Sequence, residues 1–173
     1  MTQRSEVYHE IGCGADAYWR CVFDKEYNRR LHLEAYKYES YELLEQEETD
    51  SQIIRTFAFK PKMTELPKPL RKLMEGLADP SSTEECVFDK NAGRMSVVWK
   101  PKMLAERLFM KATVWVEYKS PKLIERIADL EVRVKGLPVV TWGLEKAIVM
   151  DIEKGWEIIP KFTHQFLAEK GWS

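Results

Sequence analysis

Several features that would point to a particular compartment are absent from this sequence of 173 residues. Its three cysteines, Cys13, Cys21 and Cys86, form no C-x-x-C pair. An odd number of cysteines without a disulfide pattern predicts reduced thiols, as expected in the cytoplasm. The polar N-terminal segment MTQRSEVYHE does not resemble a signal peptide. No apolar run approaches the roughly 18 residues that a membrane-spanning helix needs.

The chain also lacks an excess of charge of either sign. Its formal net charge is −1, so the overall charge gives no reason to expect a nucleic-acid partner. Hydrophobic residues make up 45% of the chain and charged residues 32%, which is typical of one globular domain of this length. Six tryptophans and seven methionines are suggestive, although an ordinary hydrophobic core is their simplest use.

Motifs with fixed chemistry are missing as well. We find no HExxH, no G-x-S-x-G, no glycine-rich phosphate loop and no Cys/His cluster with metal spacing. Three histidines occur, His9, His32 and His164, and a lone histidine is more often structural than a catalytic base. Cys21, beside aromatic residues, suits burial better than reactivity. The sequence therefore assigns no catalytic residue, metal or cofactor.

The C-terminal part of the chain predicts one long helix that starts after Pro138, with Thr141 as its cap, and ends before Gly171. Pro160 lies inside it and predicts a kink, because proline cannot donate a hydrogen bond to the carbonyl of Trp156. Charged residues such as Glu145 suit the solvent side. The opposite face repeats every three or four positions and consists of Leu144, Ile148, Ile152, Gly155, Ile159, Phe162 and Phe166.

Most of the preceding chain has the two-residue period of β-strands. Two short helices interrupt this pattern directly after the first strand; Asp16 can cap the first, and the second covers roughly 25–34. A further short amphipathic helix is expected at 68–75. The expected strands, joined mostly as hairpins, cover residues 4–11, 36–47, 52–60, 83–90, 94–100, 108–118 and 123–135. About seven antiparallel strands would form a curved sheet around the long helix.

Two arginines fall on strand faces that otherwise look interior. Arg55 shares its face with Phe57 and Phe59, and Arg126 interrupts the apolar row of the last strand. A buried guanidinium needs an anionic partner, either a carboxylate of the chain or a ligand headgroup. Alternatively, twist or a bulge carries Arg55 to the rim, or this face is the outer one. The other inward positions of the strand 108–118 include Leu108, Met110, Ala112, Val114, Val116 and Tyr118.

One phrase occurs twice, each time at the end of an expected strand: FKPKM at residues 59–63 and WKPKM at residues 99–103. These strands run in the same direction, so both phrases should emerge at one end of the sheet. There they would form a rim of basic and apolar side chains suited to an anionic membrane or headgroup. An equally open alternative is a solvated rim above an ordinary lid. The residues proposed for contact are Lys60, Lys62, Met63, Leu70, Lys100, Lys102 and Met103.

The order of strand, two short helices, six strands and long helix resembles the START-like helix-grip superfamily, also called SRPBCC or Bet v 1-like. Within it, the segments LPKPLRKLM at 66–74 and VKGLPVV at 134–140 resemble a bacterial family of unknown function. The sequence departs from those relatives at Thr141-Trp142-Gly143, where they tend to have small residues. The resemblance implies an α+β fold, a single domain over residues 1–173, and a hydrophobic cavity between the sheet and the long helix.

The function that this resemblance implies is non-catalytic binding or transport of a hydrophobic or amphipathic, lipid-like molecule. Two alternatives stay open: an enzyme of the cyclase or aromatase kind that uses the same cavity, and an adaptor with a filled core that docks through its rim. Peripheral membrane contact is a further expectation for the rim. The residues expected to contact the ligand are Phe23, Arg55, Phe57, Phe59, Met95, Val97, Trp99, Met110, Ala112, Ile148, Ile152 and Ile159.

Overall fold

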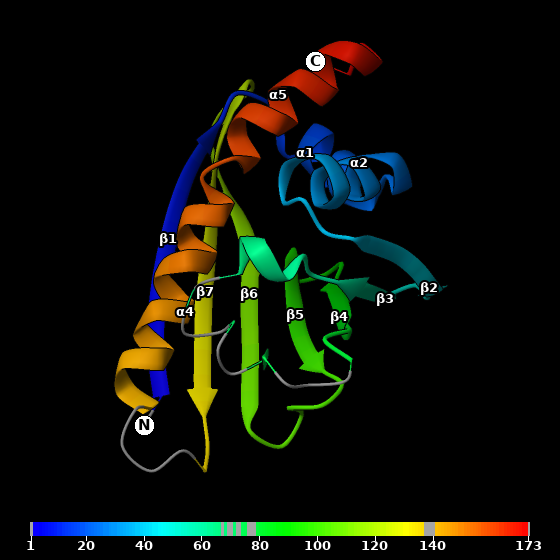
Figure 1. The fold of residues 1–173 in the computed structure, drawn as a ribbon. Coiled ribbons are helices and arrows are strands. Elements are labelled where there is room, and N and C mark those ends of the chain that lie inside the picture. Colours follow the sequence, from blue (N-terminus) through cyan, green and yellow to red (C-terminus); the bar gives the residue numbers. More distant parts are fainter. Residues whose placement is uncertain are drawn as a thin grey trace.

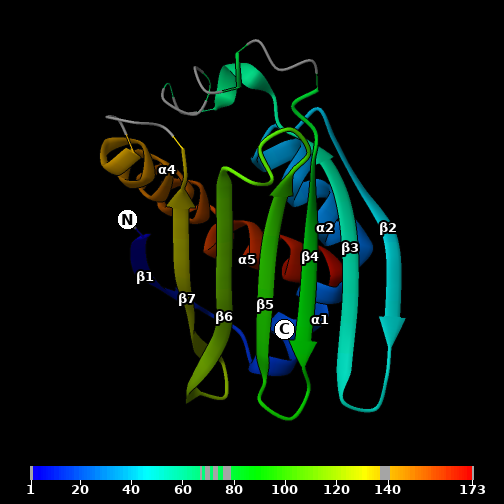
Figure 2. The same ribbon diagram turned by 90° about the horizontal axis from the view of Figure 1, so that it is seen from below.

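The computed structural model describes residues 2–66, 68, 71, 74–75, 79–136 and 141–172. Within these residues, seven strands form one antiparallel sheet in the order β1-β7-β6-β5-β4-β3-β2, and the helices cover one of its faces (Figures 1 and 2). The predicted α+β helix-grip architecture is confirmed. The strands are β1 (Thr2–Ile11), β2 (Ser40–Glu48), β3 (Gln52–Lys60), β4 (Ser82–Asp89), β5 (Arg94–Pro101), β6 (Leu108–Ser120) and β7 (Leu123–Val134).

The predicted hairpins form in the expected places. β4 and β5 pair around a turn in which Gly93 has a φ of +62°, the left-handed conformation that favours glycine. The register pairs Phe59 with Ser82 and Ser82 with Pro101, so the two Lys-Pro-Lys phrases lie at the same end of the sheet. The strand expected at 36–47 begins later, at Ser40, because a helical turn extends to Ala35.

Short helices follow β1 as predicted. They are α1 (Ala15–Phe23), α2 (Lys25–Arg30) and the π-helical turn η1 (Leu31–Ala35); a 3-10 turn, η2 (Met63–Glu65), follows β3. The cap of α1 is Gly14 and not Asp16, whose side chain lies within the first turn. Asp24 caps α2 by accepting a hydrogen bond from the Tyr27 N–H at 2.8 Å.

The long C-terminal helix is interrupted. It consists of α4 (Thr141–Trp156) and α5 (Ile159–Lys170), with Pro160 in the first turn of α5. The kink predicted at this proline is therefore a break, because Pro160 has no N–H for the carbonyl of Trp156. α5 ends as predicted before Gly171, which has a φ of +65°.

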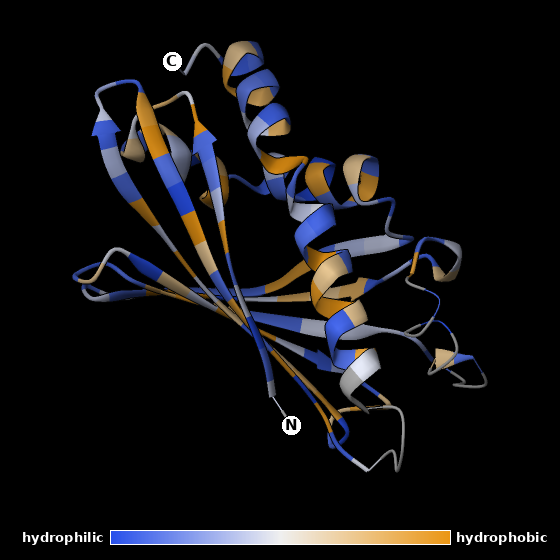
Figure 3. Cartoon of the chain, turned by 90° about the vertical axis from the view of Figure 1, so that its left-hand side faces the viewer, coloured by the Kyte–Doolittle hydropathy of each residue, from blue (hydrophilic) through white to orange (hydrophobic). Residues whose placement is uncertain are grey.

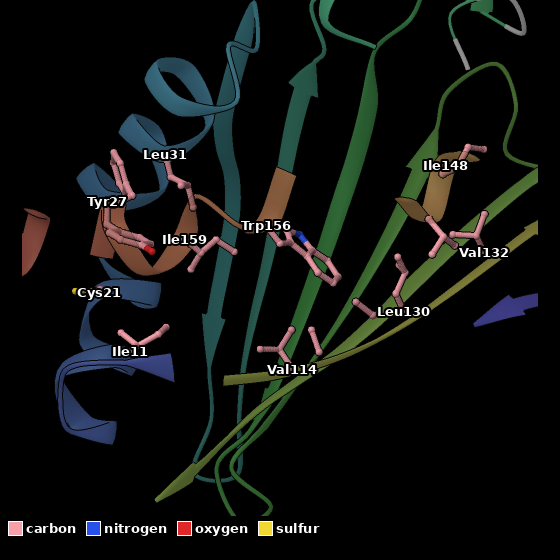
Figure 4. Close-up of a cluster of buried hydrophobic side chains, with 14 of the residues drawn as sticks. Ile11, Cys21, Tyr27, Leu31, Val114, Leu130, Val132, Ile148, Trp156 and Ile159 are labelled. Carbon is pink, nitrogen blue, oxygen red and sulfur yellow. The ribbon is translucent and has the colours of Figure 1, made fainter. Parts of the chain in front are cut away.

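The α4 part of the apolar face predicted for the long helix packs on the sheet, whereas Phe162 and Phe166 of α5 pack against the Tyr27 ring of α2. Figure 3 shows apolar and polar residues alternating along the strands and around the helices. Figure 4 shows side chains of the core, including Ile148 and Trp156 of α4, Ile159 of α5, and Leu130 and Val132 of β7. The core therefore lies between the helices and the concave face of the sheet.

Two predicted orientations are wrong. The helical pattern puts Glu145 on the solvent side, but its side chain is fully buried, and one carboxylate oxygen accepts a hydrogen bond from the Val134 N–H at 2.8 Å. That backbone group lies at the end of the last strand and needs a partner once buried. The strand pattern points Tyr118 inward, but it is 69% exposed, where an irregularity between Tyr118 and Ser120 ends the regular pairing with β7.

Some predicted features lie largely outside the described residues. The short helix at 68–75 is described only at residues 68, 71 and 74–75, and the rim residue Leu70 is not among them. The segment at 137–140, with Pro138, lies outside them as well.

Candidate functional site

A cavity of about 620 Å³ lies between the concave face of the sheet and the helices. This volume falls in the range of small-molecule sites, which is about 300–1,000 Å³. One wall consists of inward residues of β3 to β7, and the other of residues from α1, α2, η1, α4 and α5. The break after Trp156 borders the cavity, since Trp156, Ile158 and Ile159 all line it.

Eleven of the twelve residues predicted to contact a ligand line this cavity. Phe23 does not; it packs outside the cavity against Trp19 and Phe88, with ring centroids 6.0 and 5.1 Å away. The strand register explains the grouping, because Val97 pairs with Ala112 and Trp99 with Met110 on the inner face. The lining residues among those predicted are Arg55, Phe57, Phe59, Met95, Val97, Trp99, Met110, Ala112, Ile148, Ile152 and Ile159.

Arg55 is interior, so the two alternatives that put it at the rim or on an outer face are wrong. Only 3% of it is exposed, and its guanidinium lies 4.7 Å from the centroid of the Phe57 ring. Its Nη1 donates to the Val22 carbonyl at 2.8 Å, whereas its Nε and Nη2 are buried without a hydrogen-bond partner among the described residues. Burial lowers the pKa of Arg55.

Glu84 is a second charged residue of the cavity wall, and the sequence analysis missed it. It is 9% exposed, and its carboxylate accepts hydrogen bonds from the Tyr41 hydroxyl at 3.1 Å and the Trp99 indole N–H at 2.6 Å. The sequence signal was the alternation of Ser82, Glu84 and Cys86 on one face of β4. Nothing in that alternation showed which donors would surround the carboxylate.

His32 also lines the cavity and was not predicted to do so. Its ring stacks on Tyr41 with centroids 3.6 Å apart, and its Nδ1 lies 2.8 Å from the Asn28 carbonyl oxygen. A carbonyl only accepts, so Nδ1 carries the proton and Nε2 of the neutral ring is an acceptor. Burial lowers the pKa of His32, which favours this neutral form. Tyr36 and Tyr38 bring further hydroxyl-bearing rings to the same wall.

Arg126 is the second buried arginine of the wall, with 4% exposure. Its Nε donates to the Tyr18 hydroxyl at 3.1 Å, and its Nη1 lies 3.2 Å from His9 Nδ1. The guanidinium also lies 5.1 Å from the Trp156 ring. Burial, followed by the charge of Arg126, lowers the pKa of His9 to about 4, so His9 is neutral and accepts from Arg126.

The remaining candidates for chemistry lie elsewhere or are unreactive. His164 Nε2 accepts a hydrogen bond from the Gly12 N–H at 2.7 Å, which fixes α5 to the end of β1. Burial raises the pKa of the Cys21 thiol to about 12 and that of Cys13 to about 11, so neither is an activated thiolate. Among the described residues, no three His, Cys, Asp or Glu side chains are grouped to hold a metal ion.

The predicted rim is less basic than its sequence suggested. Lys60 pairs with Glu39, Lys100 with Glu85 at 3.1 Å and Lys102 with Asp79 at 2.7 Å. Lys62 lines the cavity, together with Pro61, Leu66 and Pro101 of the same end. Met103 is 48% exposed, whereas Met63 packs against the core. The rim thus borders the cavity, and acidic residues balance most of its described lysines.

Known proteins resemble this chain in structure but not in sequence. No protein-family model matches it, and no curated protein matches its sequence. Solved structures match over nearly the whole chain. They include TTHA0849 from Thermus thermophilus (TM-score 0.64, 12% identity, covering 97% of this chain and 99% of that one). A START superfamily protein from Mycobacterium smegmatis is also similar (TM-score 0.61, 12% identity, 94% and 98% covered).

A third similar structure is the Zhui aromatase/cyclase from Streptomyces sp. R1128 (TM-score 0.58, 10% identity, 94% and 92% covered). At these identities the likeness concerns the fold. The chain has the START-like helix-grip fold, also called SRPBCC or Bet v 1-like. The narrower resemblance to a bacterial family of unknown function stays a prediction. Among the described residues, no helix is long and apolar enough to cross a membrane.

Proposed function

We propose that this protein binds, and transports, a hydrophobic or amphipathic small molecule in the cavity between its sheet and its C-terminal helices, and that residues 1–173 act as one domain. The observation that carries the proposal is the cavity itself: about 620 Å³, walled mostly by apolar and aromatic side chains, with a few polar groups. Sites of this kind gain affinity from apolar contact and orientation from a small number of polar contacts.

The first test is native mass spectrometry of the purified protein, followed by extraction and identification of whatever dissociates. We expect an apolar or amphipathic molecule at about one per chain. If the protein is empty and also fails to bind a fluorescent fatty-acid or sterol probe, the proposal is wrong.

A substitution that fills the cavity gives an independent test. Ala112 is 1% exposed and lines the cavity from β6, so the larger side chain of Ala112→Leu should occupy ligand space. We expect probe affinity to fall at least about tenfold, with the fold retained. The matched control is Thr113→Leu, one residue along on the other face of β6, which should bind the probe like the wild type.

The cyclase-like or aromatase-like alternative has one observation in its favour. His32 presents a neutral ring in the cavity wall, and its Nε2 is suited to accept a proton from a bound molecule. If the protein is an enzyme, the purified His32→Gln variant should carry a bound molecule that differs from the one recovered from the wild type, because substrate is no longer converted. Recovery of the same molecule from both proteins favours a carrier.

The adaptor alternative requires a filled core, and a cavity of about 620 Å³ argues against it. Membrane contact through the rim is compatible with a carrier, but the ion pairs of Lys60, Lys100 and Lys102 reduce the attraction to anionic lipids. We therefore propose the rim as an entrance to the cavity, at which the protein touches a membrane only briefly. The three free cysteines support the proposal that the protein acts in the cytoplasm, where thiols are kept reduced.

A further inference from the structure

Arg55 has an unusual set of contacts for a buried charge. Its Nη1 is held by the Val22 carbonyl, so the two nitrogens without partners are Nε and Nη2. In a guanidinium, Nε–H and the adjacent Nη2–H point the same way and form a fork of two parallel donors. The two oxygens of a carboxylate match that fork.

The chain supplies no carboxylate for this fork among its described residues. Two carboxylates, those of Glu84 and Asp24, act on Arg55 electrostatically, and neither accepts a hydrogen bond from its Nε or Nη2. Glu84 is held by Tyr41 and Trp99, and Asp24 caps α2 through the Tyr27 N–H. A buried charged donor without a partner is costly, which is a reason to look for a partner outside the chain.

We propose that the ligand is an organic acid and that its carboxylate binds the Nε and Nη2 of Arg55 while its apolar part fills the cavity. This inference rests on the proposed function and names its ligand class. A carboxylate suits the site better than a doubly charged phosphate, because one arginine faces the group and the negative Glu84 acts on the same place. Both nitrogens are covered in this structure, so binding includes a rotation of the guanidinium toward the cavity that Arg55 lines.

The same contacts indicate how the ligand is oriented. Lys60, Lys100 and Lys102 at the rim already have acidic partners, whereas Arg55 has none among the described residues. In this arrangement the charged group lies against Arg55 on β3, and the apolar part extends along Val97 and Ala112 toward α4. This is the opposite of a headgroup that stays at a basic rim.

The test compares ligands that differ only in the charged group. Isothermal titration calorimetry at pH 7.5 would measure dodecanoate against dodecanol, and 2-naphthoate against 2-naphthalenemethanol. We expect each acid to bind about 10- to 100-fold more tightly than its alcohol, since hydrogen bonds to charged groups are worth roughly 1.5–3 kcal/mol. Dodecyl phosphate is measured alongside them.

Three variants assign that preference to the fork. Arg55→Met should bind acid and alcohol with equal affinity. Arg55→Lys, which keeps the charge but not the planar fork, should lose most of the preference. Arg94→Met makes the same change at an exposed arginine over the Trp115 ring and should keep the full preference.

Each other outcome overturns a stated part of the proposal. Equal binding of acid and alcohol by the wild type, or an acid preference that survives in Arg55→Met, means that Arg55 does not bind a carboxylate, although the cavity still binds apolar molecules. Tighter binding of dodecyl phosphate than of dodecanoate means that the ligand class is wrong. Failure of all five ligands to bind overturns both this inference and the proposed function.

Discussion

The two buried arginines of the cavity wall differ in how the chain satisfies them. Arg126, on β7, has the Tyr18 hydroxyl and His9 Nδ1 as hydrogen-bond partners and Trp156 against its guanidinium. Arg55, on β3, has the Val22 carbonyl as its one hydrogen-bond acceptor among the described residues, and its guanidinium lies over the Phe57 ring. Both are at most 4% exposed. The difference indicates that the contacts of Arg126 stabilise the fold, whereas the unpartnered nitrogens of Arg55 support its proposed role in binding a carboxylate.

The largest effect should follow from removal of Arg126. In Arg126→Leu the Tyr18 hydroxyl, itself buried, loses its partner, and so does His9. We expect a loss of about 1–3 kcal/mol in the free energy of unfolding, measured by urea denaturation. Arg94→Leu, at an exposed position, is the control and should change stability by less than about 0.5 kcal/mol. An unchanged midpoint for Arg126→Leu would show that its contacts are not structural.

The second-largest effect should be a dependence of stability on pH, which arises from His9 beside Arg126. The pKa of His9 is about 4 in the folded protein, below its ordinary value of 6.5. The unfolded chain therefore takes up a proton that the folded one does not, and stability should fall as the pH is lowered from 6.5 to 4. After allowance for the partial exposure of His9, we expect a loss of about 1–2 kcal/mol. Urea midpoints across this range check it.

The matching variant for that measurement is His9→Gln, which cannot titrate. Its stability should fall less steeply over the same pH range than that of the wild type. Parallel curves for the two proteins would mean that His9 does not contribute. The lowered pKa of buried His32 leaves some slope in both proteins, so the difference between the curves is the relevant quantity.

Of the two buried arginines, Arg55 should give the smaller change in stability, measured on Arg55→Met. The substitution removes a buried charge with two unpartnered donors and keeps an unbranched apolar side chain, at the loss of one bond to Val22. We expect the free energy of unfolding to stay equal or to rise by up to about 1 kcal/mol, by thermal and urea denaturation. A destabilisation as large as that of Arg126→Leu would remove the distinction between the two residues.

The sequence predicted more of the fold than of the site. Strand faces follow from a two-residue period, and that period placed Met110, Ala112 and Val114 on the inner face. The helical face from Leu144 to Phe166 followed in the same way. These features are local, so a pattern along the chain is sufficient to find them.

Features that depend on distant partners could not be predicted. Glu145 looked solvent-exposed because its burial depends on the Val134 N–H, a group on another element. The alternation along β4 did not reveal the hydrogen bonds of Glu84, because its donors, Tyr41 and Trp99, lie on two other strands. Phe23 has the expected helical spacing, but α1 turns it toward Phe88 and away from the cavity.

The pairing of β1 with β7 also has a consequence for the order of folding. Thr2 lies opposite Arg133, so the first strand has no partner until almost the whole sheet has been synthesised. Contacts between residues so distant in the chain form slowly, because a long loop must close first. The bonds of Arg126 to His9 and of Gly12 to His164 both wait for that step. A newly made chain therefore exposes an apolar, incomplete sheet for a time, and β1 completes that sheet at the end.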